Sequence, residues 1–258
     1  MSANDEATKG DGGGVRSVSR AVEILALLSE KRPVVSLAEI VAETGLAKTT
    51  VVRMVHTLEQ NHLVWTTAGG ITAGPGLWRW AYLAHRSWEL PAEFRQLMRD
   101  LADATRETVN LYVRRDLDRT CLAQQQGTQS LRHVVQIGDL LPLWAGASGK
   151  VLLMDASSSL LARVAAVSPK GAGLLDQLQG AIDRARHDGY VVSHGEREIG
   201  ISAIAVPVRT ASGTVGSALT ISGPTVRFTD LRIDEFRKLL ELAATEMTGR
   251  GFNHPFEN

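Results

Sequence analysis

The chain has 258 residues, 44% of them hydrophobic, and its 28 Lys and Arg balance its 28 Asp and Glu. This length and apolar content can form a substantial core, so a wholly disordered protein is excluded. The neutral balance gives the molecule no overall field toward nucleic acid or an anionic membrane. The single cysteine, Cys121, excludes an internal disulfide and a cysteine-rich zinc site.

The start of the chain carries no sign of a targeting or membrane segment. No apolar run approaches the ~20 residues that a membrane span needs, and residues 1–14 lack the basic start and apolar stretch of a signal peptide. We therefore expect a cytoplasmic protein with no membrane partner. Residues 1–14 are polar and end in three glycines, so we expect them to be a disordered tail.

Three helices are predicted next. Apolar residues recur at helical spacing between Ser17 and Glu30, and Pro33 ends that pattern. Ser36 and Glu39 have the spacing of a capping box, which predicts a short second helix that stops at Gly45. The third helix is predicted at about Lys48 to Gln60, after a tight turn.

Two short apolar runs, at 63–65 and 71–73, surround a glycine-containing turn and predict a hairpin. Three helices followed by a hairpin are typical of a winged helix-turn-helix, which we assign to residues 15–76. Pro75 and Gly76 break the chain before another helical stripe at Leu77 to His85, so residues 77–90 are predicted to be a linker helix.

The larger remainder, residues 91–250, alternates between helical and strand patterns. Helices are predicted at 93–106, 148–154, 174–188 and 230–248, and strands at 109–113, 120–124, around 190, 202–208 and 215–222. Helices at both ends of a sheet that we expect to be antiparallel indicate an α+β domain. Residues 251–258 form the predicted C-terminal tail.

The charges are unevenly distributed along the chain although their total is zero. Residues 15–86 hold eight basic and five acidic residues, a net charge of +3, while residues 1–14 carry −2 and residues 87–258 carry −1. Phosphate neutralisation needs a local basic surface rather than a basic protein. The predicted winged helix is thus the segment whose charge favours DNA.

The third helix carries residue types that read bases. In helix-turn-helix proteins the start of the second helix of the motif enters the major groove, where arginine grips guanine and threonine contacts base edges. Thr49, Thr50 and Arg53 fit that geometry, and Lys48 beside the helix N-terminus can hold a phosphate. The alternative is that the threonines only start a helix and Arg53 is a surface charge. The full predicted set is Arg20, Lys48, Thr49, Thr50, Arg53, Thr66 and Thr67.

Two separated groups of motifs resemble one known family over about residues 15–248. The first group is SVSRAVEIL at Ser17–Leu25 and TGLAKTTVVR at Thr44–Arg53; the second is PLWAGASGKVLL at Pro142–Leu153, DGY at Asp188–Tyr190, GEREIGISAIAVPV at Gly195–Val208 and SGP at Ser222–Pro224. The chain resembles the IclR family of bacterial transcriptional regulators. The resemblance implies a DNA-binding winged helix, a GAF-like effector domain, and homodimers that can pair into dimers of dimers.

The resemblance also implies an effector site. Contacts in relatives that bind small organic acids are similar to Leu141, Ala147, Ser148, Ser193, Ala203, Thr220 and Ser222 here. Thr220 and Ser222 are two apart on a predicted strand and so face one side, and backbone N–H groups around Ser148 can receive a carboxylate. The alternative is that Ser148 only caps a helix and the two hydroxyls bond local backbone. No lysine or arginine obviously lines this set.

Two positions depart from the family pattern. After the wing, the family has an aromatic and an aliphatic residue ahead of a glycine, where this chain has Ile71-Thr72-Ala73-Gly74. Trp144 stands where relatives have a smaller or polar residue. Trp144 is added to the effector set because it can widen an apolar wall and admit an aromatic acid, although it can equally be core.

An enzyme is the weaker alternative. Ser193 and His194 are adjacent on a predicted strand and point to opposite faces, so they cannot readily act as nucleophile and base. Glu196 and Glu198 have no second acid–base pair, and a salt-bridged edge explains them more simply. The seven histidines show no metal-ligand spacing, so neither a metal nor another cofactor is expected.

The sequence therefore predicts a ligand-responsive regulator, which we expect to be a repressor. An organic or aromatic acid in the C-terminal domain would control binding of a pseudo-palindromic double-stranded operator, acting through the segment from Leu77 to His85. A second hypothesis is that the C-terminal domain only oligomerises the protein. The effector, the operator, the regulated genes and the sign of regulation stay open.

Overall fold

The computed structural model describes residues 15–29, 31–87 and 89–254. The chain divides into two compact units, residues 1–89 and 90–258. The predicted disordered tail at residues 1–14 lies outside the described residues. Within the described residues, no helix is both long and apolar enough to cross a membrane.

Three helices form the first part of the N-terminal unit: α1 (Arg16–Ala26), α2 (Leu37–Thr44) and α3 (Lys48–Gln60). The prediction for the first helix was wrong at its end, because α1 stops at Ala26 rather than near residue 30. The backbones of Ser29 and Arg32 instead bond to each other in a bridge, so the chain reverses direction before Pro33.

The predicted start and end of α2 are confirmed. The Ser36 hydroxyl accepts a hydrogen bond from the Glu39 backbone N–H at 3.2 Å, and the Glu39 carboxylate accepts one from the Ser36 N–H at 2.7 Å. These two bonds, with a further ion pair to Arg32, lower the pKa of Glu39 to about 2. Gly45 ends the helix with a φ of +65°, in the left-handed region that glycine enters without strain.

A three-stranded antiparallel sheet completes the winged helix. Its strands are β1 (Val34–Val35), β2 (Val64–Thr67) and β3 (Gly70–Ala73), in the order β1-β3-β2. The hairpin of β2 and β3 is the predicted wing, whereas the two residues of β1 are too few to show a strand period and were not predicted. The helix α4 (Gly76–Ser87) follows. The core of the unit is made by Ile24, Val35, Ile40, Val51, Val55, Leu58, Val64 and Ile71.

The C-terminal unit is built on a six-stranded sheet in which every pair of neighbours is antiparallel, as expected for the predicted α+β fold. Its strands are β4 (Thr108–Arg115), β5 (Asp118–Gln125), β6 (Leu140–Pro142), β7 (Val191–His194), β8 (Ile201–Arg209) and β9 (Val215–Pro224). Their order is β6-β5-β4-β9-β8-β7, so β6 and β7 are the edges.

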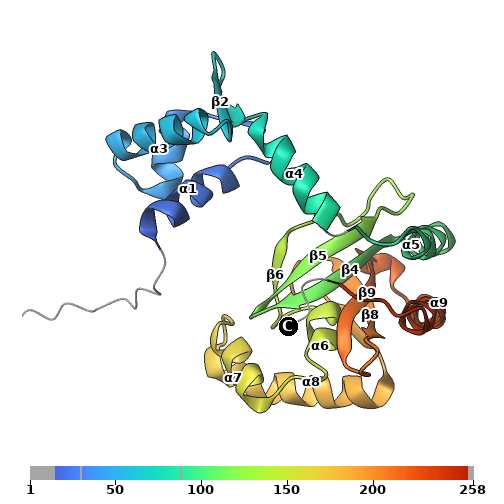
Figure 1. Cartoon of the computed structure of the whole chain (residues 1–258). Coiled ribbons are helices and arrows are strands. Elements are labelled where there is room, and N and C mark those ends of the chain that lie inside the picture. Colours follow the sequence, from blue (N-terminus) through green and yellow to red (C-terminus); the bar gives the residue numbers. More distant parts are fainter. Residues whose placement is uncertain (1–14, 30, 88, 255–258) are drawn as a thin grey trace, which may run out of the picture. The chain divides into compact units, whose positions relative to one another are not determined.

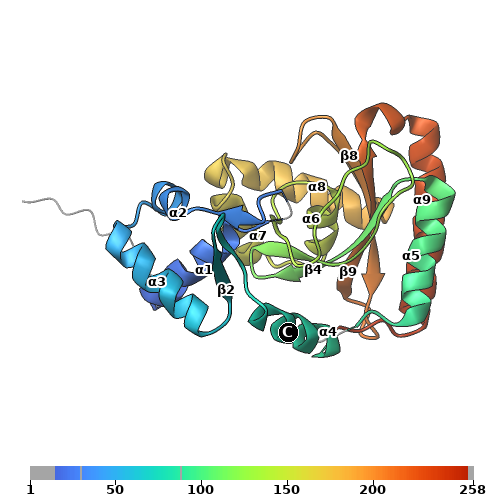
Figure 2. The ribbon, with the colours of Figure 1, turned by 90° about the horizontal axis from the view of Figure 1, so that it is seen from above.

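Helices cover both faces of this sheet (Figures 1 and 2). The long helices α5 (Ala92–Thr105) and α9 (Asp230–Gly249) pack together on one face. On the other face α6 (Ala147–Leu152) contacts β8 and β9, and α7 (Ser158–Ala166) and α8 (Leu175–Asp188) pack outside it. Short 3-10 turns lie at Gly171–Leu174 and Thr225–Arg227. The sequence patterns missed α7 and β6.

Two of the first four residues of the predicted C-terminal tail, Phe252 and His254, are buried. Phe252 is 2% exposed, and its ring lies edge-on to that of Phe94 with centroids 5.5 Å apart. The His254 ring contacts the Gly216 carbonyl oxygen at 3.1 Å. Residues 251–254 therefore belong to the C-terminal unit, and residues 255–258 lie outside the described residues.

Candidate functional site

One face of α3 is free of the core. Val51, Val55 and Leu58 are buried, whereas Thr49, Val52, Arg53 and His56 are exposed at spacings of three and four residues. Such spacing places side chains on one helical face. Lys48, the first residue of α3, is exposed too.

Two residues outside the predicted DNA-binding set share the exposed face of α3. Val52 is 44% exposed, and the His56 ring contacts the Gln60 amide at 3.0 Å; both lie on the face of Thr49 and Arg53. In the sequence, Val52 and His56 follow Thr49 by three and seven residues, and this helical spacing could have placed them on the same face as Thr49. Thr50 is half-buried, and with Arg53 it lines an apolar groove between α1 and α3. Arg20 on α1 is half-buried.

The two predicted wing residues differ in their bonding. The Thr67 hydroxyl donates to the Gly70 carbonyl at 2.9 Å and accepts from the Gly69 N–H at 3.2 Å, so it holds the turn of the wing. The Thr66 backbone N–H donates to the Glu59 carboxylate at 3.0 Å, which ties the wing to α3. Both threonine side chains stand on the exposed part of β2.

Seven of the eight predicted effector residues line one small cavity of about 40 Å³ in the C-terminal unit. The sheet register explains why, because Ser193 on β7 pairs with Ala203 on β8, which pairs with Ser222 on β9. Thr220 lies two residues before Ser222 on the same face. The seven are Leu141, Ala147, Ser148, Ser193, Ala203, Thr220 and Ser222.

Two buried polar groups of the cavity are bonded and a third is not. The Ser193 hydroxyl accepts a hydrogen bond from the Ala147 N–H at 3.0 Å. The Ser222 hydroxyl accepts from the Asn110 side-chain amide at 3.2 Å. Thr220 is only 2% exposed, and its hydroxyl has no partner. An unpaired buried hydroxyl costs free energy, so this atom is available to a polar ligand.

Two arginines that the sequence did not indicate, Arg119 and Arg197, also line the cavity. Arg119 on β5 is 3% exposed and donates to the carbonyl oxygens of Pro142 and Ala145, the latter at 2.9 Å. Its Nε has no partner. Burial lowers the pKa of Arg119 to about 10, and the group remains charged at neutral pH. Nothing in the strand pattern around Arg119 indicated an inward-pointing cation.

His133 is the third basic group at the cavity. Its Nδ1 lies 3.0 Å from the Ser222 hydroxyl, and its Nε2 lies 2.7 Å from a guanidinium nitrogen of Arg197. Burial and the neighbouring Arg197 charge lower the pKa of His133 below its ordinary value. The neutral ring can therefore accept from Arg197 through Nε2.

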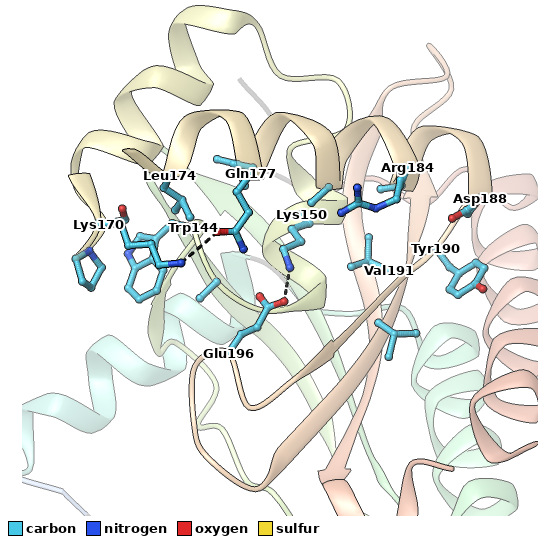
Figure 3. A pocket seen from close by; sticks show the side chains of 17 residues that line it. Trp144, Lys150, Lys170, Leu174, Gln177, Arg184, Asp188, Tyr190, Val191 and Glu196 are labelled. Carbon is cyan, nitrogen blue, oxygen red and sulfur yellow. Dashed lines mark hydrogen bonds and ion pairs between the residues drawn. The ribbon is translucent and has the colours of Figure 1, made fainter. Parts of the chain in front are cut away.

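Trp144 does not line this cavity, contrary to the prediction. It is half-exposed, between buried Leu143 and Ala145, and its ring forms a wall of a neighbouring groove of about 600 Å³ beneath α8. Figure 3 shows this groove, with Lys170 near Trp144 and Arg184 farther along α8.

Ser193 and His194, the residues weighed as nucleophile and base, bond to different partners. Ser193 is buried, while the exposed His194 bonds through Nδ1 to the Ser202 hydroxyl at 2.8 Å. Cys121 is fully buried, and this burial raises the pKa of its thiol to about 12. Among the described residues, no group of three or more His, Cys, Asp or Glu side chains is arranged to hold a metal ion.

Two family patterns match this chain: the IclR helix-turn-helix domain at residues 17–66, and the bacterial transcriptional regulator IclR C-terminal domain at residues 82–248. The chain belongs to the IclR family of bacterial transcriptional regulators. It therefore combines a helix-turn-helix DNA-binding domain with a C-terminal effector domain. Relatives are named as regulators and repressors, so this IclR-family member is a DNA-binding regulator and not an enzyme.

Individual relatives extend over most of the chain. The acetate operon repressor of Salmonella typhimurium is 30% identical, over 92% of this chain and 90% of its own. The structure of an IclR-family regulator from Rhodococcus sp. is 41% identical, with a TM-score of 0.63, covering 96% of this chain and 98% of its own. An IclR homologue from Microbacterium hydrocarbonoxydans, solved in complex with 4-hydroxybenzoate, is 23% identical with a TM-score of 0.71 and coverages of 90% and 98%.

Proposed function

We propose that this IclR-family protein is a cytoplasmic repressor whose DNA affinity is controlled by a small organic or aromatic acid. The observation that carries the proposal is the cavity of the C-terminal unit. It combines the buried Arg119 guanidinium with the unpartnered Thr220 hydroxyl. Polar groups that converge in a cleft with few internal partners are the ordinary mark of a ligand site.

The exposed face of α3 supports operator binding by direct contact with bases. Arg53 can bond guanine in two places, Thr49 can contact base edges, and Val52 can pack against a thymine methyl group. Lys48 and the wing residues Thr66 and Thr67 are exposed, and in this proposal they contact phosphates. Arg20, which lies on α1, is the last of the residues that we propose to contact DNA.

Exposed apolar surface supports a homodimer, which would match a pseudo-palindromic operator. On α1, Val18 is 60% and Val22 57% exposed. On α4, Trp78 is 80% and Trp80 60% exposed. Apolar side chains gathered in this way mark interaction surfaces. Pairing of two such dimers on DNA is part of the same proposal.

The basic groups of the cavity support an acid as effector. Arg119 and Arg197 favour a carboxylate, and the 4-hydroxybenzoate bound to the homologue from Microbacterium hydrocarbonoxydans is an acid of this class. We propose that the effector acts on the winged helices through the segment Leu77–His85, which joins the two units in sequence. A C-terminal domain that only oligomerises would not explain why the Thr220 hydroxyl and the Arg119 Nε are buried without partners.

The reciprocity of binding tests this function. Effector candidates are first found by thermal shift with a panel of organic and aromatic acids, 4-hydroxybenzoate included. If an acid weakens operator binding by a factor of about 5 to 150, the operator must weaken binding of the acid by the same factor. Anisotropy titrations of DNA and calorimetric titrations of the acid measure both. Equal affinity for the acid with and without operator would overturn the proposal.

A further inference from the structure

The turn between β7 and β8 brings a carboxylate of the chain itself to the rim of the cavity. Glu196 accepts a hydrogen bond from the Gly146 backbone N–H at 2.9 Å through Oε2, and forms an ion pair with the Lys150 ammonium through Oε1. The Lys150 side chain is 13% exposed and that of Glu196 33%. Both oxygens of the carboxylate are therefore bound by groups that would suit any carboxylate.

The same turn is held at a second point and is bracketed by glycines. Arg197 contacts the His133 ring at 2.7 Å. Gly195 and Gly200 have φ values of +61° and +84°, a region that side-chain-bearing residues rarely enter. The turn thus lies over the cavity, with two side-chain contacts that close it and a permissive residue at either end.

The space beneath the turn is too small for an organic acid. About 40 Å³ is enough for a water molecule or two, whereas ligand sites usually measure hundreds of Å³. Yet the cavity keeps an unpartnered hydroxyl on Thr220 and an unpartnered Nε on Arg119, both more than nine-tenths buried. These atoms point to a ligand independently of the turn, and admitting that ligand requires something to move.

We propose that Glu196 is a built-in occupant of the carboxylate position, and that an acidic effector replaces it on the Gly146 N–H and the Lys150 ammonium. The inference rests on the proposed function, since it concerns how the effector of that same cavity enters. The effector is then a carboxylate that competes with the Glu196 side chain for the Gly146 N–H and the Lys150 ammonium. The apparent Kd of the wild type is then the intrinsic Kd divided by the fraction of molecules in which Glu196 has left the position.

Glu196 lies between the small cavity and the groove beneath α8. Glu196 lines both the small cavity and the groove beneath α8, where Figure 3 shows its ion pair with Lys150 at the centre of the groove. Departure of the carboxylate would free the space at the one described residue that lines both. The apolar part of an effector can then extend toward Trp144, which the sequence had placed in the effector set.

Rescue of a deletion by a small anion tests this inference without knowledge of the effector. Glu196→Ala removes the atoms beyond Cβ, and acetate carries the same carboxylate and one further carbon. With the full-length variant at pH 7, 100 mM potassium acetate should raise the Tm above that in potassium chloride of equal ionic strength. Occupancy with a Kd near ~10 mM corresponds to a rise of about 3 to 6 °C.

Two variants of the same turn are the controls. Glu198→Ala also removes a carboxylate, but the Glu198 side chain is 55% exposed and its carboxylate contacts the side chains of His133 and Arg197, so acetate should act as on the wild type. Glu196→Gln keeps the volume filled and should gain far less than Glu196→Ala. A Glu196→Ala protein with no acetate-specific rise, or a rise equal to that of Glu198→Ala, would overturn the inference. That outcome leaves operator binding by the wild type untouched, so the two failures are distinguishable.

Discussion

Arg53 and Lys48 lie five residues apart on α3, and their expected roles differ. Arg53 shares the exposed face with Thr49 and Val52, whereas Lys48 is the first residue of the helix. Base contacts specify a sequence, and phosphate contacts hold the protein on any sequence. The two cations should therefore be separable by mutation.

Arg53→Ala should weaken operator binding by about 1 to 3 kcal/mol and relax the base preference at one position of each half-site. Lys48→Ala is the matched control, and should weaken specific and random DNA alike. Anisotropy titrations on both duplexes give the four affinities. A loss of equal size on random DNA would make Arg53 a phosphate contact.

His133 links the cavity to pH. Because its pKa in the folded protein lies below its ordinary value near 6.5, the unfolded chain binds more protons in the interval between the two values. The stability contributed by the neutral ring is thus complete above about pH 6.5 and is lost as the pH falls toward the folded pKa. Glu198, 3.7 Å from Nε2, opposes the lowering of the pKa but does not reverse it.

Urea unfolding of the wild type and of His133→Gln, measured between pH 8 and pH 5, tests this linkage. The wild type should lose more stability than the variant as the pH falls below 6.5, since a glutamine side chain cannot take up a proton in this range. Identical slopes for both proteins would show that His133 does not contribute.

At the scale of single residues, the sequence revealed the side chains that share a strand face but not those that reach the cavity from elsewhere. Thr220 and Ser222 were assigned through the resemblance to the IclR family, and strand alternation, which is a local rule, placed both on one face. Arg119, His133 and Arg197 come from three separate segments and meet only through the sheet order and the turn after β7. Trp144 lines the neighbouring groove and not the small cavity, and no periodic pattern in the sequence describes the turn that precedes α6.

Among the elements, α6 depends on a close approach that only glycine permits. A Cβ on Gly149 would lie 2.4 Å from the Leu143 carbonyl oxygen, a backbone atom that cannot easily yield. In α8, by contrast, a Cβ on Gly180 would meet only the end of the Arg184 side chain, at 3.7 Å. The packing of α6 therefore requires a glycine at position 149, whereas α8 has room for a side chain at position 180.

Gly149→Ala should destabilise the protein by about 1 to 3 kcal/mol, because α6 must shift away from Leu143. Gly180→Ala should instead stabilise it by about 0.5 to 1 kcal/mol, because alanine favours a helix interior. Chemical denaturation of both variants measures the difference. Equal effects of the two substitutions would contradict this description of α6.

Elements with strong local signals were predictable, and elements formed by tertiary contact were not. The capping box at Ser36 and the stop at Gly45 delimit α2 because both are properties of neighbouring residues. Strand β1 exists only because Val34 and Val35 pair with β3. The apolar pattern of the first helix ran past Ala26 because Leu27 and Leu28 continue into the core after the helix has ended.

For the whole molecule, the neutral charge has a functional meaning. The N-terminal segment from 15 to 86 carries +3, and the rest of the chain cancels it. Nonspecific attraction to DNA should therefore be weak, and affinity must come from a few contacts placed twice by a dimer. Such affinity is easily changed when a ligand alters how those contacts are placed.

The most direct test of this account is selection of DNA from a randomised duplex library by the full-length wild-type protein. If a dimer presents α3 twice, one site with two-fold symmetry should be enriched, its half-sites separated by about one helical turn or a multiple of it. A selected pool that shows no common sequence, while the protein remains folded, would contradict the claim that α3 reads an operator.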